Sequence, residues 1–438
     1  MKYIKFIIPA LLILVIANFS LAQQINGRFS TSFYSWERFT GVNTSNIITR
    51  LYQNLQFDAS HEQFSFDTSL TGAIGGASSF SDDGLVRVYN AYIRWKNIGN
   101  VLDVNVGRVP VFAGVGIGTV DGLLFKSKLY GDKVILTGYG GSNVSSNLQM
   151  NGYKNIDKNF FTGGQLIAYL FDGSRIGLSY TNRNRLMKGY TTIRPDSIYD
   201  PISVIIQPEV RKEQVAGMDA SYYFGTQFSA YGRFDYDINS SHILRGEVNS
   251  RVVVTQKLAF TGTYLYREPH IPYHSFFSIF EGESINEIEG GVEYSLCSPI
   301  STFGRVAFVQ YGEELSRRLS IGVNSKYCSF RYSGSNGYTG QLVSYNAEAM
   351  YPLFDRKFVP TAGASFTIYR LDEKIGKREE LFGGSLGVIV RLMSSFSIDT
   401  QVQWLRNKIV KDDVRVFGKV SYWFNHNFSK SQITGAGE

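Results

Sequence analysis

Cysteine, proline and charged residues are scarce in this chain, and no internal apolar run is long enough for a membrane helix. Of the 438 residues only 2 are cysteines and 10 are prolines, and charged residues make up 18%. Cys297 and Cys328 form neither a disulfide framework nor a metal-binding pattern, so we expect two free thiols. A transmembrane helix needs about 20 apolar residues, and no internal run approaches that length. These absences argue against both a helical membrane protein and a disulfide-rich secreted domain.

Glycine and aromatic residues are abundant instead. The chain has 44 glycines, 28 tyrosines and 32 phenylalanines. This composition is typical of a β-protein with aromatic girdles and small residues facing a lumen.

The clearest local pattern runs from Glu379 to Arg406 and alternates between apolar and polar residues. Before Ser394 the apolar residues Phe382, Leu386, Val388, Val390 and Leu392 share one parity. After Ser395 the alternation resumes, ending at Val402 and Trp404. Successive side chains of a strand point to opposite faces, so this stretch predicts a hairpin with one apolar and one polar face. Each strand has about ten residues or more, the length that crosses a bilayer at a tilt.

The same unit recurs along most of the chain. We expect about twenty-two strands, with about eighteen as the lower bound, from Ile25–Trp36 to Asp413–Phe424. The expected connections alternate between long, such as Asn184–Arg211, and short, such as Asp172–Gly173. Short periplasmic turns and long external loops are what a transmembrane barrel has. The expected fold is therefore all-β, a single antiparallel transmembrane β-barrel without a plug domain.

The two ends of the chain carry separate expectations. Residues 1–22 combine Lys2 and Lys5, a short apolar segment and small residues before Gln23, which is typical of a signal peptide. Without it, 42 basic residues face 37 acidic ones, too mild an excess to indicate nucleic acid. We expect the barrel over residues 23–424 and a polar tail over 425–438.

The polar parity of the expected strands supplies candidate pore-lining residues of both signs. They are Arg233, Asp235, Arg245, Glu247, Arg251, Glu287, Glu289, Glu293, Arg318, Glu348, Arg391, Asp399 and Arg415. The longest loop adds Arg183, Arg185 and Arg194 as candidates for a constriction, if it folds inward. Charges within about 8 Å of a solute escape most screening, so such a loop would give a weak anion preference.

Two features resemble the bacterial outer-membrane porin superfamily. The segment from Arg87 to Arg108 is similar to the strand–turn–strand ending in Gly-Arg of large porin-like barrels, and the last strand ends in Tyr422-Trp423-Phe424. The resemblance implies an outer-membrane channel for passive diffusion of small hydrophilic solutes. It also implies contact with outer-membrane lipid, lipopolysaccharide and the assembly machinery, and it is compatible with a homo-oligomer. The tail after Phe424 departs from the porin pattern.

Three local patterns suggest chemistry, and each has a plainer interpretation. Gly114, Gly116, Gly118 and Gly122 lack the helix and acidic residue of a nucleotide fold, so we expect a plain external connection or a loop folding into the barrel mouth. His270 and His274 lie among prolines that disfavour a metal-binding helix, so an aromatic loop is the better interpretation.

The third pattern, Asn239 to His242, is expected to be a tight turn and not a catalytic cluster. We therefore expect no enzyme activity, no metal and no cofactor. A channel remains the main hypothesis, and a barrel with a structural, surface-attachment or assembly role is the alternative.

The alternation predicts a barrel that resists detergent at low temperature. The mature chain should migrate differently on gels with and without boiling, and its circular dichroism in detergent should be dominated by strand. A helix-rich spectrum from a soluble chain would contradict the barrel.

Overall fold

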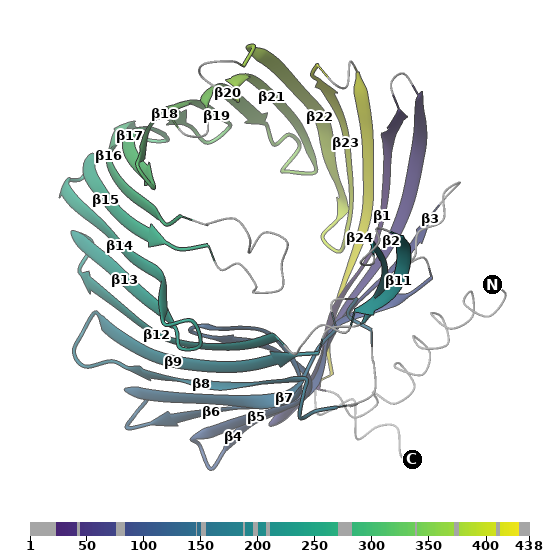
Figure 1. Ribbon diagram of the computed structural model, residues 1–438, viewed down its shortest axis with the longest axis vertical. Helices are drawn as coiled ribbons and strands as arrows, with labels where there is room; N and C mark the ends of the chain where they lie inside the picture. The colour runs from purple at the N-terminus through teal and green to yellow at the C-terminus, as the bar shows by residue number, and fades with distance from the viewer. Residues whose placement is uncertain are drawn as a thin grey trace.

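The chain forms a closed ring of strands, each paired antiparallel with its neighbour in sequence (Figure 1). In the computed structural model the ring contains 22 strands. It closes where β1 (Gln24–Gly41) pairs with β24 (Asp413–Asn427), from Gln24↔Asn427 to Ser35↔Val416. Closure leaves no free sheet edge, which is what backbone amides require in hydrocarbon.

The structure describes most of the chain, with gaps at the N-terminus, the C-terminus and several connections. The described residues are 23–41, 44–75, 84–145, 147–149, 155–186, 189–195, 200–206, 211–269, 283–337, 340–371, 376–408 and 412–428. The expected signal peptide and the pair His270 and His274 lie outside them.

The remaining ring strands follow one another around the barrel. The first eight are β2 (Thr44–His61), β3 (Phe64–Gly75), β4 (Val86–Ile98), β5 (Leu102–Ala113), β6 (Gly116–Leu129), β7 (Val134–Asn143), β8 (Phe160–Ala168) and β9 (Ser174–Arg185). The next six are β12 (Arg211–Phe224), β13 (Phe228–Asp237), β14 (His242–Thr255), β15 (Leu258–Arg267), β16 (Ile285–Cys297) and β17 (Ile300–Tyr311). The last six are β18 (Glu314–Asn324), β19 (Cys328–Asn336), β20 (Gln341–Met350), β21 (Phe358–Arg370), β22 (Glu379–Met393) and β23 (Phe396–Arg406).

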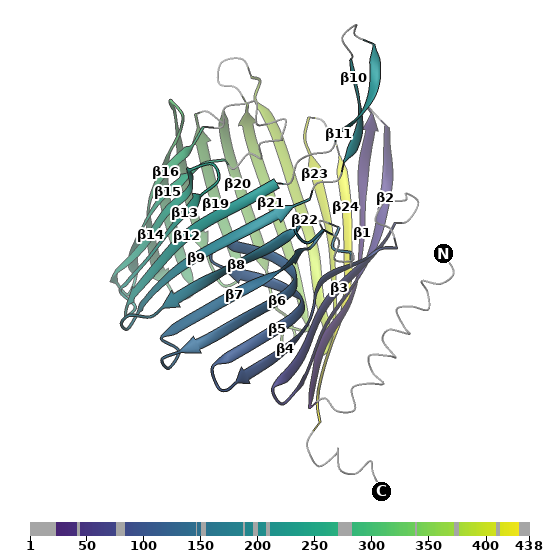
Figure 2. The same cartoon turned by 60° about the horizontal axis from the view of Figure 1, so that its bottom comes forward.

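The expected strand count and antiparallel order are confirmed, and two differences concern the longest connection and the last strand. The strands β10 (Tyr190–Pro195) and β11 (Pro201–Ile206) form a separate two-stranded hairpin within the longest one. Figure 2 shows this hairpin beyond the upper ends of β1 and β2. At the C-terminus β24 continues past Phe424 to Asn427, because β1 begins early enough to pair with those residues.

The outer face of the barrel is apolar, as alternation requires. Large side chains on the outward parity are exposed, among them Ile288, Phe308 and Leu386. Aromatic pairs sit on neighbouring strands, with ring centroids 5.4 Å apart for Phe64 and Trp95. Among the described residues no helix is long and apolar enough to cross a membrane.

Both cysteines lie at the end of the barrel that carries the short turns. Cys297 ends β16 and Cys328 begins β19. Both are exposed free thiols, which confirms the expectation from their spacing.

The orientation of the barrel is testable by labelling. In a background carrying Cys297→Ser and Cys328→Ser, new cysteines at Thr191 and Lys377 lie on the long-loop side, and one at Ser394 lies in a short turn. On intact cells an impermeant thiol reagent should label the first two and spare the third, because short turns face the periplasm. Labelling at Ser394 alone would reverse the topology.

Candidate functional site: the barrel lumen

The tip of the β5–β6 hairpin leaves the barrel wall and lies inside the lumen. The β4–β5 ladder ends at Ala91↔Arg108, and the β6–β7 ladder ends at Val120↔Asn143. Beyond these points β5 and β6 pair only with each other, up to Ala113↔Gly116. We call residues 109–120 the lumen hairpin.

The lumen hairpin rests on inward-facing side chains of β7, β8 and β9. The amide of Val115 donates to Ser179 Oγ at 3.1 Å, and Arg183 Nη2 donates to the Ile117 carbonyl at 2.7 Å. The same guanidinium lies 3.7 Å from the ring centroid of Phe161. On β9 the opposite parity, with Leu178 and Tyr180, is exposed on the outer face. The hairpin therefore lies against the inner face of the wall.

A small apolar core forms where the lumen hairpin meets the wall. From the hairpin come Val109, Val111, Ala113 and Val120, and from the wall come Tyr92, Tyr139 and Phe161, all buried. Tyr139 and Phe161 meet edge to face, with centroids 4.9 Å apart. Burial of this apolar surface, at about 25 cal/mol per Å², stabilises the packing of the hairpin against the wall.

The other face of the lumen hairpin points away from the wall and into the barrel. It carries Phe112 and Ile117, which are cross-strand partners and are 79% and 54% exposed. The hairpin therefore presents an apolar edge to the lumen.

Three glycines in register allow the sheet to bend where the lumen hairpin leaves it. Gly107 of β5 pairs with Gly122 of β6, which pairs with Gly141 of β7. A Cβ on Gly122 would collide with the Gly140 carbonyl oxygen, and one on Gly107 with the Ala91 carbonyl oxygen. Glycine inside a strand marks a tight bend or a close backbone approach, and this row provides both.

Arg108 occupies the gap that opens between β4 and β5. Its Nε and Nη2 donate to Asp121 at 2.6 and 2.7 Å, and its Nη1 donates to the carbonyls of Val88 and Leu148. The Val88 amide donates to the Leu148 carbonyl at 2.9 Å. Arg108 is 1% exposed, so this cation is buried but paired. It supplies the hydrogen bonds that the departing strand would otherwise have made.

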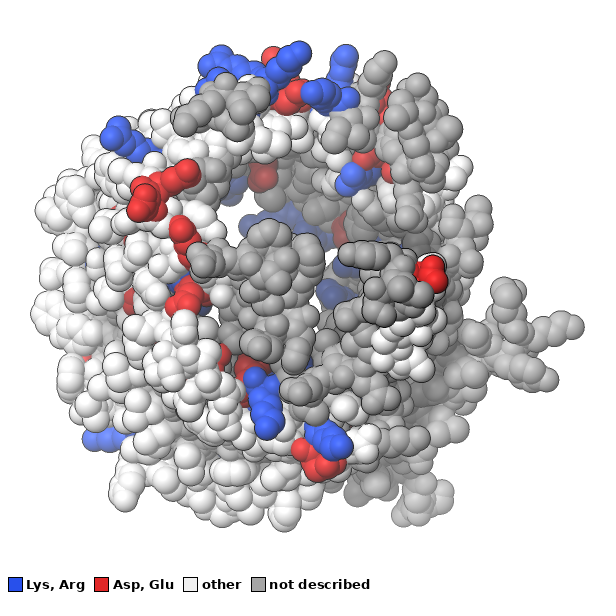
Figure 3. Space-filling model, in the orientation of Figure 1, with Lys and Arg blue, Asp and Glu red and all other residues white. Residues whose placement is uncertain are grey.

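The wall from β13 to β18 carries arginines and acids that pair with one another. Arg233 Nε lies 2.9 Å from Asp235, Arg251 Nε lies 3.0 Å from Glu293, and Arg318 Nη2 lies 3.0 Å from Glu289. Glu287 also contacts Arg318, and Arg245 contacts Glu247. Figure 3 shows charged side chains of both signs around the central hollow. Local pairing leaves little net field along this part of the wall.

The other pore-lining candidates have different partners. Arg415 Nη2 lies 2.7 Å from Asp413, and Arg391 Nη1 donates to the Arg356 carbonyl at 2.9 Å. Asp399 lies opposite Lys419 in the β23–β24 register. Glu348 lies on β20 opposite Ser329 of β19.

The constriction candidates separate in the structure. Arg183 lies buried under the lumen hairpin, while Arg185 ends β9 and Arg194 belongs to β10, beyond the rim (Figure 2). The longest loop therefore does not place Arg194 in the lumen. The glycine stretch from Gly114 does fold inward, as the tip of a hairpin and not as the plain connection that we expected.

The remaining motifs show no catalytic arrangement in the described part of the chain. His242 Nδ1 lies 2.7 Å from Glu268 Oε1, and Ser240 donates its amide to Asp237 in the turn. The described residues contain no group of three or more His, Cys, Asp or Glu side chains placed to hold a metal ion.

One sequence signal could have revealed the lumen hairpin. The stretch from Val109 to Ala113 is apolar on both parities, whereas a strand between lipid and water alternates. Such a run marks a strand that does not separate lipid from water, and here Val109, Val111 and Ala113 are covered while Phe112 is exposed.

Comparison with known proteins identifies structures of similar fold. No protein-family model and no curated protein matches this chain. Among solved structures, the ferric enterobactin receptor (PfeA) of Pseudomonas aeruginosa, in a mutant form, matches 91% of this chain and 80% of its own, with a TM-score of 0.57 and 8% identity. The P pilus usher (PapC) translocation pore has a TM-score of 0.46 at 9% identity, covering 93% of this chain and 100% of its own. OccAB4 of Acinetobacter baumannii has a TM-score of 0.41 at 9% identity, with the same two coverages. The similarity to the receptor, at 8% identity, shows the fold alone, which is a large closed β-barrel.

The role of the buried ion pair between Arg108 and Asp121 can be tested by mutation. Asp121→Asn should destabilise the barrel by about 3–5 kcal/mol, because Arg108 would be left as a buried cation without its counter-charge. The measurement is urea unfolding of the barrel refolded in lipid vesicles. Asp103→Asn is the matched control, because Asp103 lies on the neighbouring strand β5 and its carboxylate accepts a hydrogen bond from the Asn97 amide in an exposed turn. Equal stability of both variants would show that the pair does not hold the gap.

Proposed function

We propose that this protein is an outer-membrane channel through which small hydrophilic solutes diffuse passively. The observation that carries the proposal is the charged, inward-facing wall of a closed barrel, whose described residues include a hairpin in the lumen but no globular plug. Charged side chains on an inner face attract water, and a wide barrel with such a lining is water-filled.

The lumen hairpin sets the narrowest passage in this proposal. It occupies space in front of β7, β8 and β9, and its exposed edge consists of Phe112 and Ile117. Size exclusion would come from this edge. The ion-paired side chains on β13 to β18 would keep the rest of the passage filled with water. Selectivity in such pores follows from constriction size and from charge.

The location and partners follow from the same proposal. The exposed apolar outer face fits outer-membrane lipid and lipopolysaccharide, and the chain would reach that membrane through the export signal in residues 1–22 and the outer-membrane assembly machinery. A homo-oligomer is compatible with this surface. We propose a channel and not an enzyme, with a weak preference for anions.

Single-channel recording tests the channel and its constriction together. Replacement of Pro110–Thr119 by a Gly-Gly link should raise the conductance in planar bilayers, because Val109 and Val120 are already paired and the space of the hairpin tip becomes free. The matched control replaces the external hairpin Tyr190–Ile206 by the same link and should leave the conductance unchanged.

Two outcomes would count against the proposal. A folded barrel that never conducts would favour the alternative, a barrel with a structural, attachment or assembly role. Equal conductance with and without the lumen hairpin would show that the constriction lies elsewhere.

A further inference from the structure

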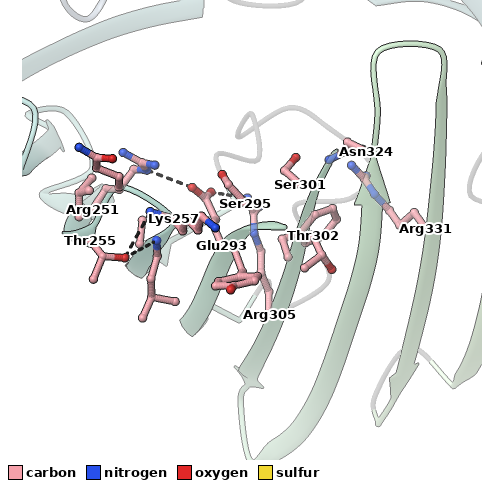
Figure 4. Close-up of a pocket in the computed structure, with 16 residues that line it drawn as sticks. Arg251, Thr255, Lys257, Glu293, Ser295, Ser301, Thr302, Arg305, Asn324 and Arg331 are labelled. Carbon is pink, nitrogen blue, oxygen red and sulfur yellow. Dashed lines mark hydrogen bonds and ion pairs between the residues drawn. The ribbon is translucent and has the colours of Figure 1, made fainter. Parts of the chain in front are cut away.

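A pocket opens in the inner wall near the short-turn end of the barrel. It has a volume of about 340 Å³ and is lined by residues from the consecutive strands β14 to β19 (Figure 4). The charged lining residues of β14, β16, β17 and β19 belong to the inward parity, because their neighbours Val252, Val292, Val306 and Phe330 are exposed on the outer face. The pocket therefore faces the solute path.

Cations dominate the lining of this pocket. Arg251, Lys257, Arg305 and Arg331 surround it, and Glu293 is the only carboxylate among its lining residues. Glu293 is shared, lying 3.0 Å from Arg251 and 3.6 Å from Arg305. Among the described residues no carboxylate lies within ion-pair distance of Arg331 or Lys257. This contrasts with Arg233, Arg245 and Arg318 elsewhere on the wall, each of which has a carboxylate partner.

An aromatic ring holds two of these cations in place. The guanidinium carbons of Arg305 and Arg331 lie 5.2 and 5.5 Å from the ring centroid of Phe303. A Cβ on Gly322 would collide with that ring, so the glycine makes the ring position available. Each cation–π contact contributes about 0.5–1 kcal/mol at an exposed site. Arg305 and Arg331 are thus kept close together, although fewer carboxylates than cations line the pocket.

Neutral hydrogen-bonding groups complete the lining. Ser295, Ser301 and Asn324 lie between the cations in Figure 4. Hydroxyl and amide groups can donate to an oxyanion whose charge the guanidinium groups balance. The volume lies at the low end of the range for small-molecule sites, so the pocket suits a small ligand.

We propose that this pocket is a binding site for small oxyanions, that is, for the carboxylate or phosphate group of a solute on its way through the channel. Guanidinium groups bind both kinds of oxyanion with two parallel hydrogen bonds. The proposal rests on the channel function and adds to it the class of preferred solute. It also places the source of anion preference in the wall and not in the longest loop.

The test records the chloride current of the full mature protein in planar bilayers while inorganic phosphate, or in a second arm acetate, is added on the short-turn side. At least one of the two anions should reduce the current to a saturating level. Arg331→Gln should raise the half-saturating concentration about tenfold, since a charge-assisted contact is lost. Arg331 makes no ion pair within the described chain, so this substitution leaves no carboxylate unpaired. The matched control is Arg317→Gln on β18, close to the long-loop end, where it removes the same charge outside the pocket.

The outcomes separate this proposal from the channel itself. Saturation by phosphate at lower concentration than by acetate assigns the site to phosphate groups, and the reverse order assigns it to carboxylates. A conducting barrel with no saturable effect of either anion, or with equal shifts in both variants, overturns the site and leaves the channel standing. If the barrel does not conduct, equilibrium dialysis of phosphate against the detergent-solubilised protein still decides whether the pocket binds.

Discussion

The structure depends on one constraint, which is that every backbone amide and carbonyl within the membrane needs a hydrogen-bond partner. Closure of β1 on β24 meets this constraint around the ring. The lumen hairpin breaks the ring locally, because residues beyond Arg108 and Val120 no longer pair with β4 and β7. The Arg108 side chain and the Leu148 carbonyl provide the missing partners for Val88. A buried, paired arginine thus makes an inward-folded hairpin compatible with a closed wall.

The lumen hairpin also inverts the usual division of a barrel into an apolar outside and a polar inside. Its apolar core, which includes Val111 of the hairpin and Phe161 of the wall, lies within the lumen. Barrels with 22 strands are wide enough to enclose a plug. In the described residues of this chain, a piece of the wall itself takes up part of that width. The row of Gly107, Gly122 and Gly141 lets the sheet bend without a collision.

The charges of the inner wall fall into two groups with different consequences. Arg233 is paired with Asp235, and Arg318 contacts both Glu287 and Glu289, so neither cation lacks a counter-charge. The field of such groups decays within the screening length of about 8 Å. Around Phe303 the cations outnumber the carboxylates, and a field of one sign remains. On the proposed path a solute would therefore meet paired charges first and an excess of cations near the short-turn end.

The sequence by itself determined the strands, their number and which parity faces outward, because alternation has a period of two residues and is set by each strand alone. It also indicated that Cys297 and Cys328 are free. Only the tertiary structure decided which connection enters the lumen. That choice depends on contacts between distant segments, such as Arg183 with Ile117, and on the space left inside the closed ring. The run from Val109 to Ala113 departs from the alternation of a wall strand, but it does not show which segment would cover it. The cationic pocket was equally out of reach, since its residues come from six strands that only closure and register bring together.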